Sequence, residues 1–183
     1  MKRKKSNPLL QKRISILDLT LVPNHGIFAG ERKSYKSTFM LLKNLKPVSN
    51  SHKGKDTIDI RIEEGLIKEI GSGLKAGKGE ETHDFGGAYV SPGWMDMHIH
   101  LREPGFEHKE TIKTGCDAAA FGGFTAVACM PNTKPATHTR DVVEFIIKKA
   151  EKLPVDVHPI ACVTKERKGK SIAEMADMKE GGA

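Results

Sequence analysis

Two histidines separated by one residue, His98 and His100, are the residues of this chain best suited to chemistry. Alternate residues of a β-strand point to the same face, so both imidazoles can reach one metal ion. Zinc is the ion that most often takes nitrogen ligands of this kind. Arg102 continues the same face and offers a planar guanidinium to a carboxylate. The spacing therefore predicts His98 and His100 as metal ligands of a metallohydrolase, with Arg102 as a substrate-binding residue.

Strands and helices alternate in the part of the chain that carries these residues. Apolar runs that are typical of strands cover residues 89–101, with a kink at Pro92-Gly93, then 124–130 and 155–163. Helical spacing covers about 108–121, and a second helix begins at Thr139. A third helix is predicted to begin at Ser171, because Ser171 to Glu174 has the pattern of a capping box. Three parallel βα units are therefore expected in residues 89–183.

Such units can form two architectures, an open doubly wound sheet or a (β/α)8 barrel. A barrel needs about 250 residues, so a chain of 183 residues would hold only its first part. We predict the α/β class, as the N-terminal part of a (β/α)8 TIM-type barrel with about three βα units. In parallel barrels the C-terminal ends of the strands carry the active site. Asn132 follows the second predicted strand there, either as a turn residue or as a substrate hydrogen-bonding residue.

A small β module is predicted before the barrel, over residues 38–88. Ile58, Ile60 and Ile62 alternate with polar residues, and residues 66–70 return as a hairpin partner. The Gly- and Lys-rich stretch at 71–79 has the spacing of neither common phosphate-binding loop, so a surface loop is expected. We predict a β-sandwich-like module.

Residues 1–37 form a basic leader. Residues 1–36 hold nine of the 30 Lys and Arg and two of the 23 Asp and Glu, so they account for the whole net charge of +7. The rest of the chain is balanced, which argues against a nucleic-acid-binding body. The leader has three interpretations: an extension that is flexible or partly ordered, translation upstream of a natural start at Met40, or a functional basic arm.

The three cysteines lack the spacing of a metal or disulfide framework, which favours reduced, buried thiols in a cytoplasmic protein. No apolar run approaches the roughly 20 residues that span a bilayer, so no membrane association is expected.

Two histidines do not complete a zinc site, because catalytic zinc takes at least three protein ligands. His108 and His138 are weaker candidates, and His158 is expected to be structural or at the solvent edge.

Four segments resemble the dihydroorotases of the cyclic amidohydrolase family. They are residues 91–105 (SPGWMDMHIHLREPG), 109–115 (KETIKTG), 118–123 (AAAFGG) and 130–133 (MPNT). The resemblance runs from about Met40 to Ala183, and the leader lies outside it. It implies a zinc enzyme, with one or two ions, that interconverts N-carbamoyl-L-aspartate and L-dihydroorotate in pyrimidine synthesis. It also implies that His98 and His100 bind zinc and that Arg102 and Asn132 hold the substrate carboxylate.

The same resemblance implies that the remaining zinc ligands and the general acid/base lie beyond Ala183. No catalytic residue is therefore assigned within this chain, and the chain by itself is expected to be inactive and to bind zinc weakly. The alternatives are a dihydropyrimidinase or allantoinase, a non-catalytic scaffold for a partner such as aspartate transcarbamoylase, and a nucleic-acid binder acting through the leader. The expected partner is a small-molecule substrate, and a homo-oligomer or association with aspartate transcarbamoylase is left open.

Overall fold

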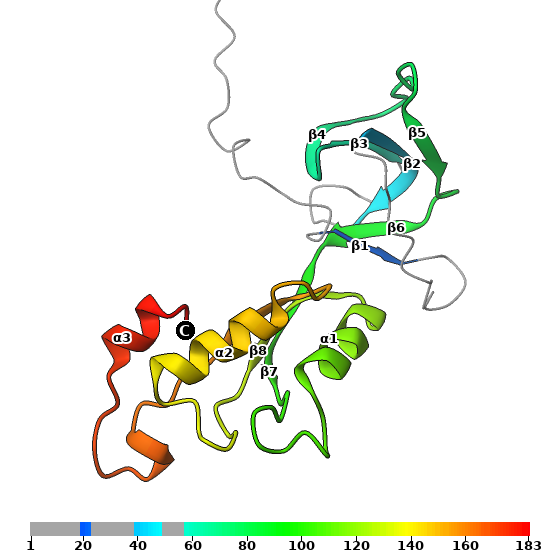
Figure 1. Ribbon diagram of the computed structural model, residues 1–183. Coiled ribbons are helices and arrows are strands. Elements are labelled where there is room, and N and C mark those ends of the chain that lie inside the picture. The colour runs from blue at the N-terminus through cyan, green and yellow to red at the C-terminus, as the bar shows by residue number, and fades with distance from the viewer. Residues whose placement is uncertain (1–18, 23–38, 49–56) are drawn as a thin grey trace, which may run out of the picture.

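The computed structural model describes residues 19–22, 39–48 and 57–183, which form two sheets joined by a short connection (Figure 1). The first sheet has the strand order β1-β6-β2-β3-β4, and β5 pairs in parallel with β2. Its strands are β1 (Leu19–Val22), β2 (Phe39–Pro47), β3 (Ile58–Glu63), β4 (Leu66–Gly71), β5 (Glu81–Asp84) and β6 (Tyr89–Pro92). The strand β1 comes from the predicted leader and pairs antiparallel with β6. The other leader residues lie outside the described part of the chain.

The predicted hairpin of the small module is present. Strands β3 and β4 pair antiparallel across a turn at Glu64 and Gly65, both of which have positive φ. The isoleucines of β3 join a core formed by Met40, Leu42, Leu45, Ile60, Ile62 and Val90. The polar face of β3 is also covered, since Asp59 is buried and accepts hydrogen bonds from the backbone N–H groups of Asn44 and Leu74. The Gly- and Lys-rich stretch is an exposed loop, as predicted.

A single strand was expected over residues 89–101, but the structure divides it in two. Residues Tyr89–Pro92 form β6 in the first sheet, and β7 (Trp94–Ile99) begins the second. Gly93 separates them, and a Cβ atom there would lie 2.0 Å from Thr125 Oγ1. The chain therefore passes from one sheet to the other at a position where the neighbouring strand leaves no room for a side chain.

The second sheet has three parallel strands in the order β7-β8-β9. Its βα units are completed by α1 (Ile112–Phe121), β8 (Phe124–Cys129), α2 (Arg140–Ala150), β9 (Asp156–Pro159), the 3-10 helix η3 (Lys165–Arg167) and α3 (Met175–Glu180). Consecutive strands are neighbours, as in a barrel, whereas a doubly wound sheet reverses its strand order at a switch point. The three predicted βα units are therefore confirmed. Among the described residues, no helix is long and apolar enough to cross a membrane.

The core of the second sheet lies between its strands and the first two helices. Ile112 and Cys116 of α1 and Val142 and Ile146 of α2 are buried there, in agreement with the predicted helical spacing. Helix α2 follows Thr139 as its N-cap, and α1 ends before Gly122, both as predicted.

Three predicted boundaries are wrong. Helix α1 begins at Ile112, because the Thr111 side chain caps it and forms a capping box with Thr114. The third strand ends at Pro159. The helix expected from Ser171 begins at Met175, since Ile172 instead forms a β-bridge with Thr164 and the Ala173 N–H donates to the Val163 carbonyl. Local sequence favoured a cap at Ser171, but pairing with residues 163–164 keeps this segment extended.

Acid should weaken the small module through Glu80. The Glu80 side chain is fully buried and accepts a hydrogen bond of 2.8 Å from Arg61 Nε, which outweighs desolvation and holds the Glu80 pKa below its ordinary value of 4.5. A carboxyl group with a lowered folded-state pKa stabilises the fold above its unfolded pKa and stops doing so as the pH falls through the folded value. We expect the protection of β3 amides from exchange, taken relative to the intrinsic exchange rate at each pH, to fall below about pH 4.5, and this pH dependence to be smaller in Glu80→Gln. An unchanged dependence in the variant would rule Glu80 out as its source.

The buried thiols should resist modification. All three cysteines are free and buried, and burial raises the pKa values of Cys116 and Cys129 to about 11. At pH 8 only about one such thiol in a thousand is a thiolate, which is the reactive form. We expect 5,5′-dithiobis(2-nitrobenzoate) to react with the native chain at least about 100-fold more slowly than with the chain unfolded in guanidinium chloride. Rapid reaction of two or more thiols in the native chain would contradict this packing.

Candidate metal and substrate site

The end of β7 brings the two predicted metal ligands together. The ring centroids of His98 and His100 lie 5.5 Å apart, with an angle of 69° between the ring planes. His98 is exposed and His100 is half-buried. Upstream on β7, Asp96 Oδ1 accepts a hydrogen bond of 2.9 Å from the His98 backbone N–H. Two adjacent imidazoles therefore stand at the C-terminal edge of the parallel sheet.

The pairing of β7 with β8 is irregular at this point. Asp96 is opposite Val127, and Ile99 is opposite Cys129, so β7 has one more residue than β8 between these pairs. An extra residue of this kind is a β-bulge, which bends a strand and redirects its side chains. The sequence prediction assumed a regular strand through Arg102. In the structure β7 ends at Ile99, and His100 follows the strand.

Asn132 lies beside His100, as its place after β8 predicted. Its Oδ1 atom is 2.8 Å from His100 Nδ1. The backbone supports this contact, because the Met130 N–H donates to the Ile99 carbonyl at 2.9 Å and so extends the β7–β8 pairing. A metal-ligand candidate and a substrate-binding candidate, 32 residues apart in sequence, thus form one cluster.

Arg102 has a left-handed backbone conformation, with φ of 63°. The Glu103 N–H donates to the Leu101 carbonyl at 2.7 Å, so Arg102 is the central residue of a tight three-residue turn. A non-glycine residue with positive φ is strained and persists where its surroundings fix it. Within the described part of the chain, the guanidinium of Arg102 has no hydrogen bond or ion pair, including any to Asn132. The group is therefore available to a ligand.

Glu103 fixes the conformation of this turn, a role that the sequence analysis missed. Its side chain is buried, Oε2 accepts a hydrogen bond of 2.9 Å from the Ile112 N–H at the start of α1, and Oε1 pairs with Lys149 Nζ of α2. One carboxylate thus connects the residue after Arg102 to two helices. No specific signal in the sequence indicated this role, because Glu103 lies nine residues before Ile112 and the favourable effect of negative charge at a helix N-terminus is confined to the first turn.

A second connection joins the two loops of the site. The Lys134 N–H donates to the Pro104 carbonyl at 2.9 Å. Gly105 has φ of 95°, and a Cβ atom there would lie 2.1 Å from the Lys134 carbonyl oxygen. Only glycine allows the loop after β7 to approach the loop after β8 this closely. The loop that carries Arg102 and the loop that carries Asn132 therefore fix each other's position.

The chemistry of the donors fits a zinc ion in part. Two imidazoles are suitable ligands, but among the described residues no group of three or more His, Cys, Asp or Glu side chains is placed to hold a metal. His108 is exposed, and His138 Nδ1 lies 2.9 Å from the Ala136 carbonyl oxygen. The structure brings neither residue to the pair. His100 and Asp96 border a cavity of about 270 Å³ between β7 and α1, which Glu110 also lines.

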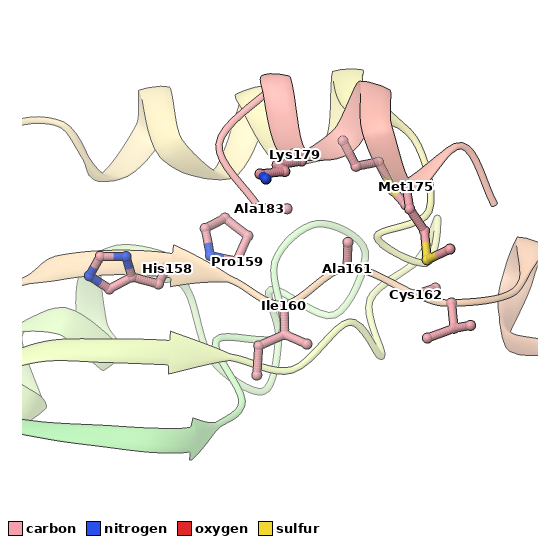
Figure 2. A pocket seen from close by; sticks show the side chains of 10 residues that line it. His158, Pro159, Ile160, Ala161, Cys162, Met175, Lys179 and Ala183 are labelled. Atoms are coloured by element: carbon pink, nitrogen blue, oxygen red, sulfur yellow. The ribbon is translucent and has the colours of Figure 1, made fainter.

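A larger cavity, of about 420 Å³, lies between β9 and α3 and has no part in this cluster (Figure 2). Its walls are mainly apolar, from Pro159, Ile160, Ala161, Cys162 and Met175, with His158 and Lys179 at its border. His158 is exposed on β9, in agreement with the solvent-edge prediction. None of His98, His100, Arg102 and Asn132 lines this cavity.

Removing the Glu103 carboxylate should destabilise the second sheet and its helices. We expect Glu103→Ala to lower the free energy of unfolding by about 2–3 kcal/mol, because it leaves the buried Ile112 N–H without a partner and removes an ion pair. Chemical denaturation of the 183-residue chain measures this loss. Glu151→Ala, at an exposed position after α2, is the control and should change stability by less than about 0.5 kcal/mol. Equal stabilities for the two variants would contradict the role of Glu103.

Comparison with known proteins identifies a family for the second half of the chain. A family model described as dihydro-orotase-like matches residues 87–183, just over half of the chain. Dihydroorotases of Geobacter sp. (strain M21) and Trichlorobacter lovleyi are each 46% identical to it over 144 residues, which is 78% of this chain and 34% of each relative. The chain thus spans about a third of the length of these curated relatives.

Solved structures show the same fold. An L-hydantoinase (dihydropyrimidinase) from Arthrobacter aurescens matches with a TM-score of 0.62 and 28% identity, over 70% of this chain and 28% of that one. A D-hydantoinase matches with a TM-score of 0.54 and 27% identity, over 79% of this chain and 38% of that one. These neighbours confirm the predicted partial TIM barrel of an amidohydrolase. The matched residues contain the cluster at the ends of β7 and β8, and the chain belongs to the dihydroorotase-like family.

Proposed function

We propose that this chain supplies the first metal ligands and the carboxylate-binding residues of a zinc-dependent dihydroorotase. Such an enzyme interconverts N-carbamoyl-L-aspartate and L-dihydroorotate in pyrimidine synthesis. The observation that carries the proposal is the cluster of His98, His100 and Asn132 at adjoining strand ends, in a chain whose family and curated relatives are dihydroorotases.

His98 and His100 would hold the zinc ion. A bound zinc ion supplies a Lewis acid that polarises a carbonyl group and brings the pKa of a water molecule close to 7. Among the described residues no third His, Cys, Asp or Glu side chain joins this pair, and we expect the further ligands and the general acid/base from other parts of a complete enzyme. We therefore expect the 183-residue chain by itself to be inactive and to bind zinc weakly.

Arg102 and Asn132 would bind and orient the substrate through its carboxylate. The guanidinium of Arg102 has no partner among the described residues and can form two parallel hydrogen bonds to a carboxylate. The Asn132 side-chain oxygen contacts His100 Nδ1, so the NH₂ group of Asn132 can donate to the same carboxylate. Both residues stand on loops that are fixed to each other, which would hold the reacting ring in one orientation beside the histidines.

A dihydropyrimidinase is the second candidate, because L- and D-hydantoinases are among the similar structures. Hydantoin and dihydropyrimidine rings carry no free carboxylate, so they would leave the Arg102 guanidinium without a counter-charge. This favours dihydroorotate.

A scaffold without catalysis would not need two adjacent imidazoles, and a leader that binds nucleic acid would not use this cluster. Free buried cysteines are consistent with a reducing compartment, and we propose a cytoplasmic protein. Homo-oligomers or association with aspartate transcarbamoylase stay predictions.

A segment exchange tests the substrate. The matching 144 residues of the Geobacter sp. (strain M21) dihydroorotase would be replaced by those of this chain, and the zinc-loaded product assayed with dihydroorotate and dihydrouracil. We expect turnover of dihydroorotate and a loss of at least about 100-fold in kcat/KM in Arg102→Met, because the substrate carboxylate loses its charged partner. The control, Lys109→Met, changes an exposed lysine near the same loop and should retain activity. Hydrolysis of dihydrouracil but not of dihydroorotate would overturn the proposal.

A further inference from the structure

The contact between Asn132 and His100 restricts which nitrogen of His100 can bind a metal. Asn132 Oδ1 lies 2.8 Å from His100 Nδ1, and an amide oxygen carries no hydrogen. The hydrogen of this bond must therefore be on Nδ1. A neutral imidazole that is protonated at Nδ1 has its lone pair on Nε2, which is then the one nitrogen able to coordinate a metal ion.

We propose that Asn132 is a positioning residue for the metal ligand His100, in addition to a substrate-binding residue. Its oxygen holds His100 in the Nδ1–H tautomer and presents Nε2 to the metal, while its NH₂ group faces the substrate carboxylate. This inference rests on the proposed function, because it takes His100 to be a metal ligand. It goes beyond that function because it assigns to the Asn132 side chain contacts with both the metal ligand and the substrate.

The loop after β8 is built to hold Asn132 in place. Thr133 Oγ1 donates to the Pro135 carbonyl at 2.8 Å and lies 3.1 Å from Thr137 Oγ1. Thr137 is buried, and its backbone N–H donates to the Pro131 carbonyl at 3.2 Å. Asn132 thus lies inside a small hydrogen-bonded loop, so that little conformational entropy is lost when its side chain orients His100.

The NH₂ group of Asn132 has no hydrogen-bond partner among the described residues, although the side chain is only half-exposed. A half-buried donor group beside the two histidines is placed to meet a bound molecule. The opposite orientation of the amide makes a different prediction. If Nδ2 donated to His100 Nδ1, the imidazole hydrogen would be on Nε2, and His100 could not bind a metal through that atom.

The tautomer of His100 is measurable without metal or substrate. Long-range ¹H–¹⁵N correlation spectra of the metal-free, ¹⁵N-labelled 183-residue chain at pH 8 distinguish the two tautomers, and a His100→Gln variant assigns the signals. We expect the Nδ1–H tautomer in the wild-type chain and in Asn132→Asp, which keeps an oxygen acceptor. In Asn132→Leu, which has a similar size and no acceptor, the Nε2–H tautomer should become the major form. Lys134→Ala, an exposed change in the same loop, is the control and should match the wild type.

Metal affinity supplies a second readout. Zinc titration should give a dissociation constant about 10–100-fold weaker for Asn132→Leu than for the wild type and for Asn132→Asp, because an outer partner that orients a ligand is lost. An Nε2–H tautomer in the wild-type chain, or an unchanged tautomer in Asn132→Leu, would overturn the inference. If Asn132→Leu does not fold, the wild-type tautomer and Asn132→Asp still decide. If the tautomer is as expected but His100→Gln leaves zinc affinity unchanged, the metal-ligand proposal fails instead.

Discussion

Parallel pairing of β7 with β8 is the interaction on which the candidate site depends. The two histidines and Arg102 are far in sequence from Asn132, and only the register that places Ile99 opposite Cys129 brings His100 beside it. The bulge in β7 sets this register locally, since it inserts one extra residue just before the strand ends. A shift of one residue in the pairing would move the histidines to the other face. The proposed site thus depends on backbone pairing between the strands as well as on its side chains.

The loops that follow β7 and β8 fix the positions of the candidate site residues. Glu103 fixes the turn that carries Arg102 by binding the start of α1 and the side chain of Lys149. The close approach of Gly105 to Lys134 then joins that turn to the loop of Asn132. Strain at Arg102 is maintained by these contacts. A site assembled from strained turns on a rigid sheet is preorganised, which is what orientation of a substrate requires.

Much of this fold could be predicted from the sequence, because its signals are local. Apolar runs ended by Pro131 and Gly122 gave the strands and helices, and the alternation of Ile58, Ile60 and Ile62 gave the hairpin. The errors arose where distant contacts prevail over local preference. Ser171 has the pattern of a cap, yet residues 172 and 173 pair with residues 164 and 163. The apolar run from Tyr89 was predicted as one kinked strand, yet β6 belongs to the first sheet.

The sequence suggested candidate site residues but not the contacts that connect them. Residue type and spacing were enough to select His98, His100, Arg102 and Asn132. No sequence pattern indicates a bulge between Asp96 and Ile99, a left-handed Arg102, or a Glu103 carboxylate shared by two helices. These features depend on three-dimensional contacts between residues up to 46 positions apart. They also decide which atoms of the selected residues are available to a ligand.

The central claim is that His98 and His100 form one metal-binding pair, which is preformed at the end of β7. It is tested most directly by titrating zinc into the ¹⁵N-labelled chain while following the imidazole signals of all eight histidines. We predict that the signals of His98 and His100 change together, at lower zinc concentrations than the other six. Signals of His98 and His100 that change at different zinc concentrations, or not at all, would contradict it.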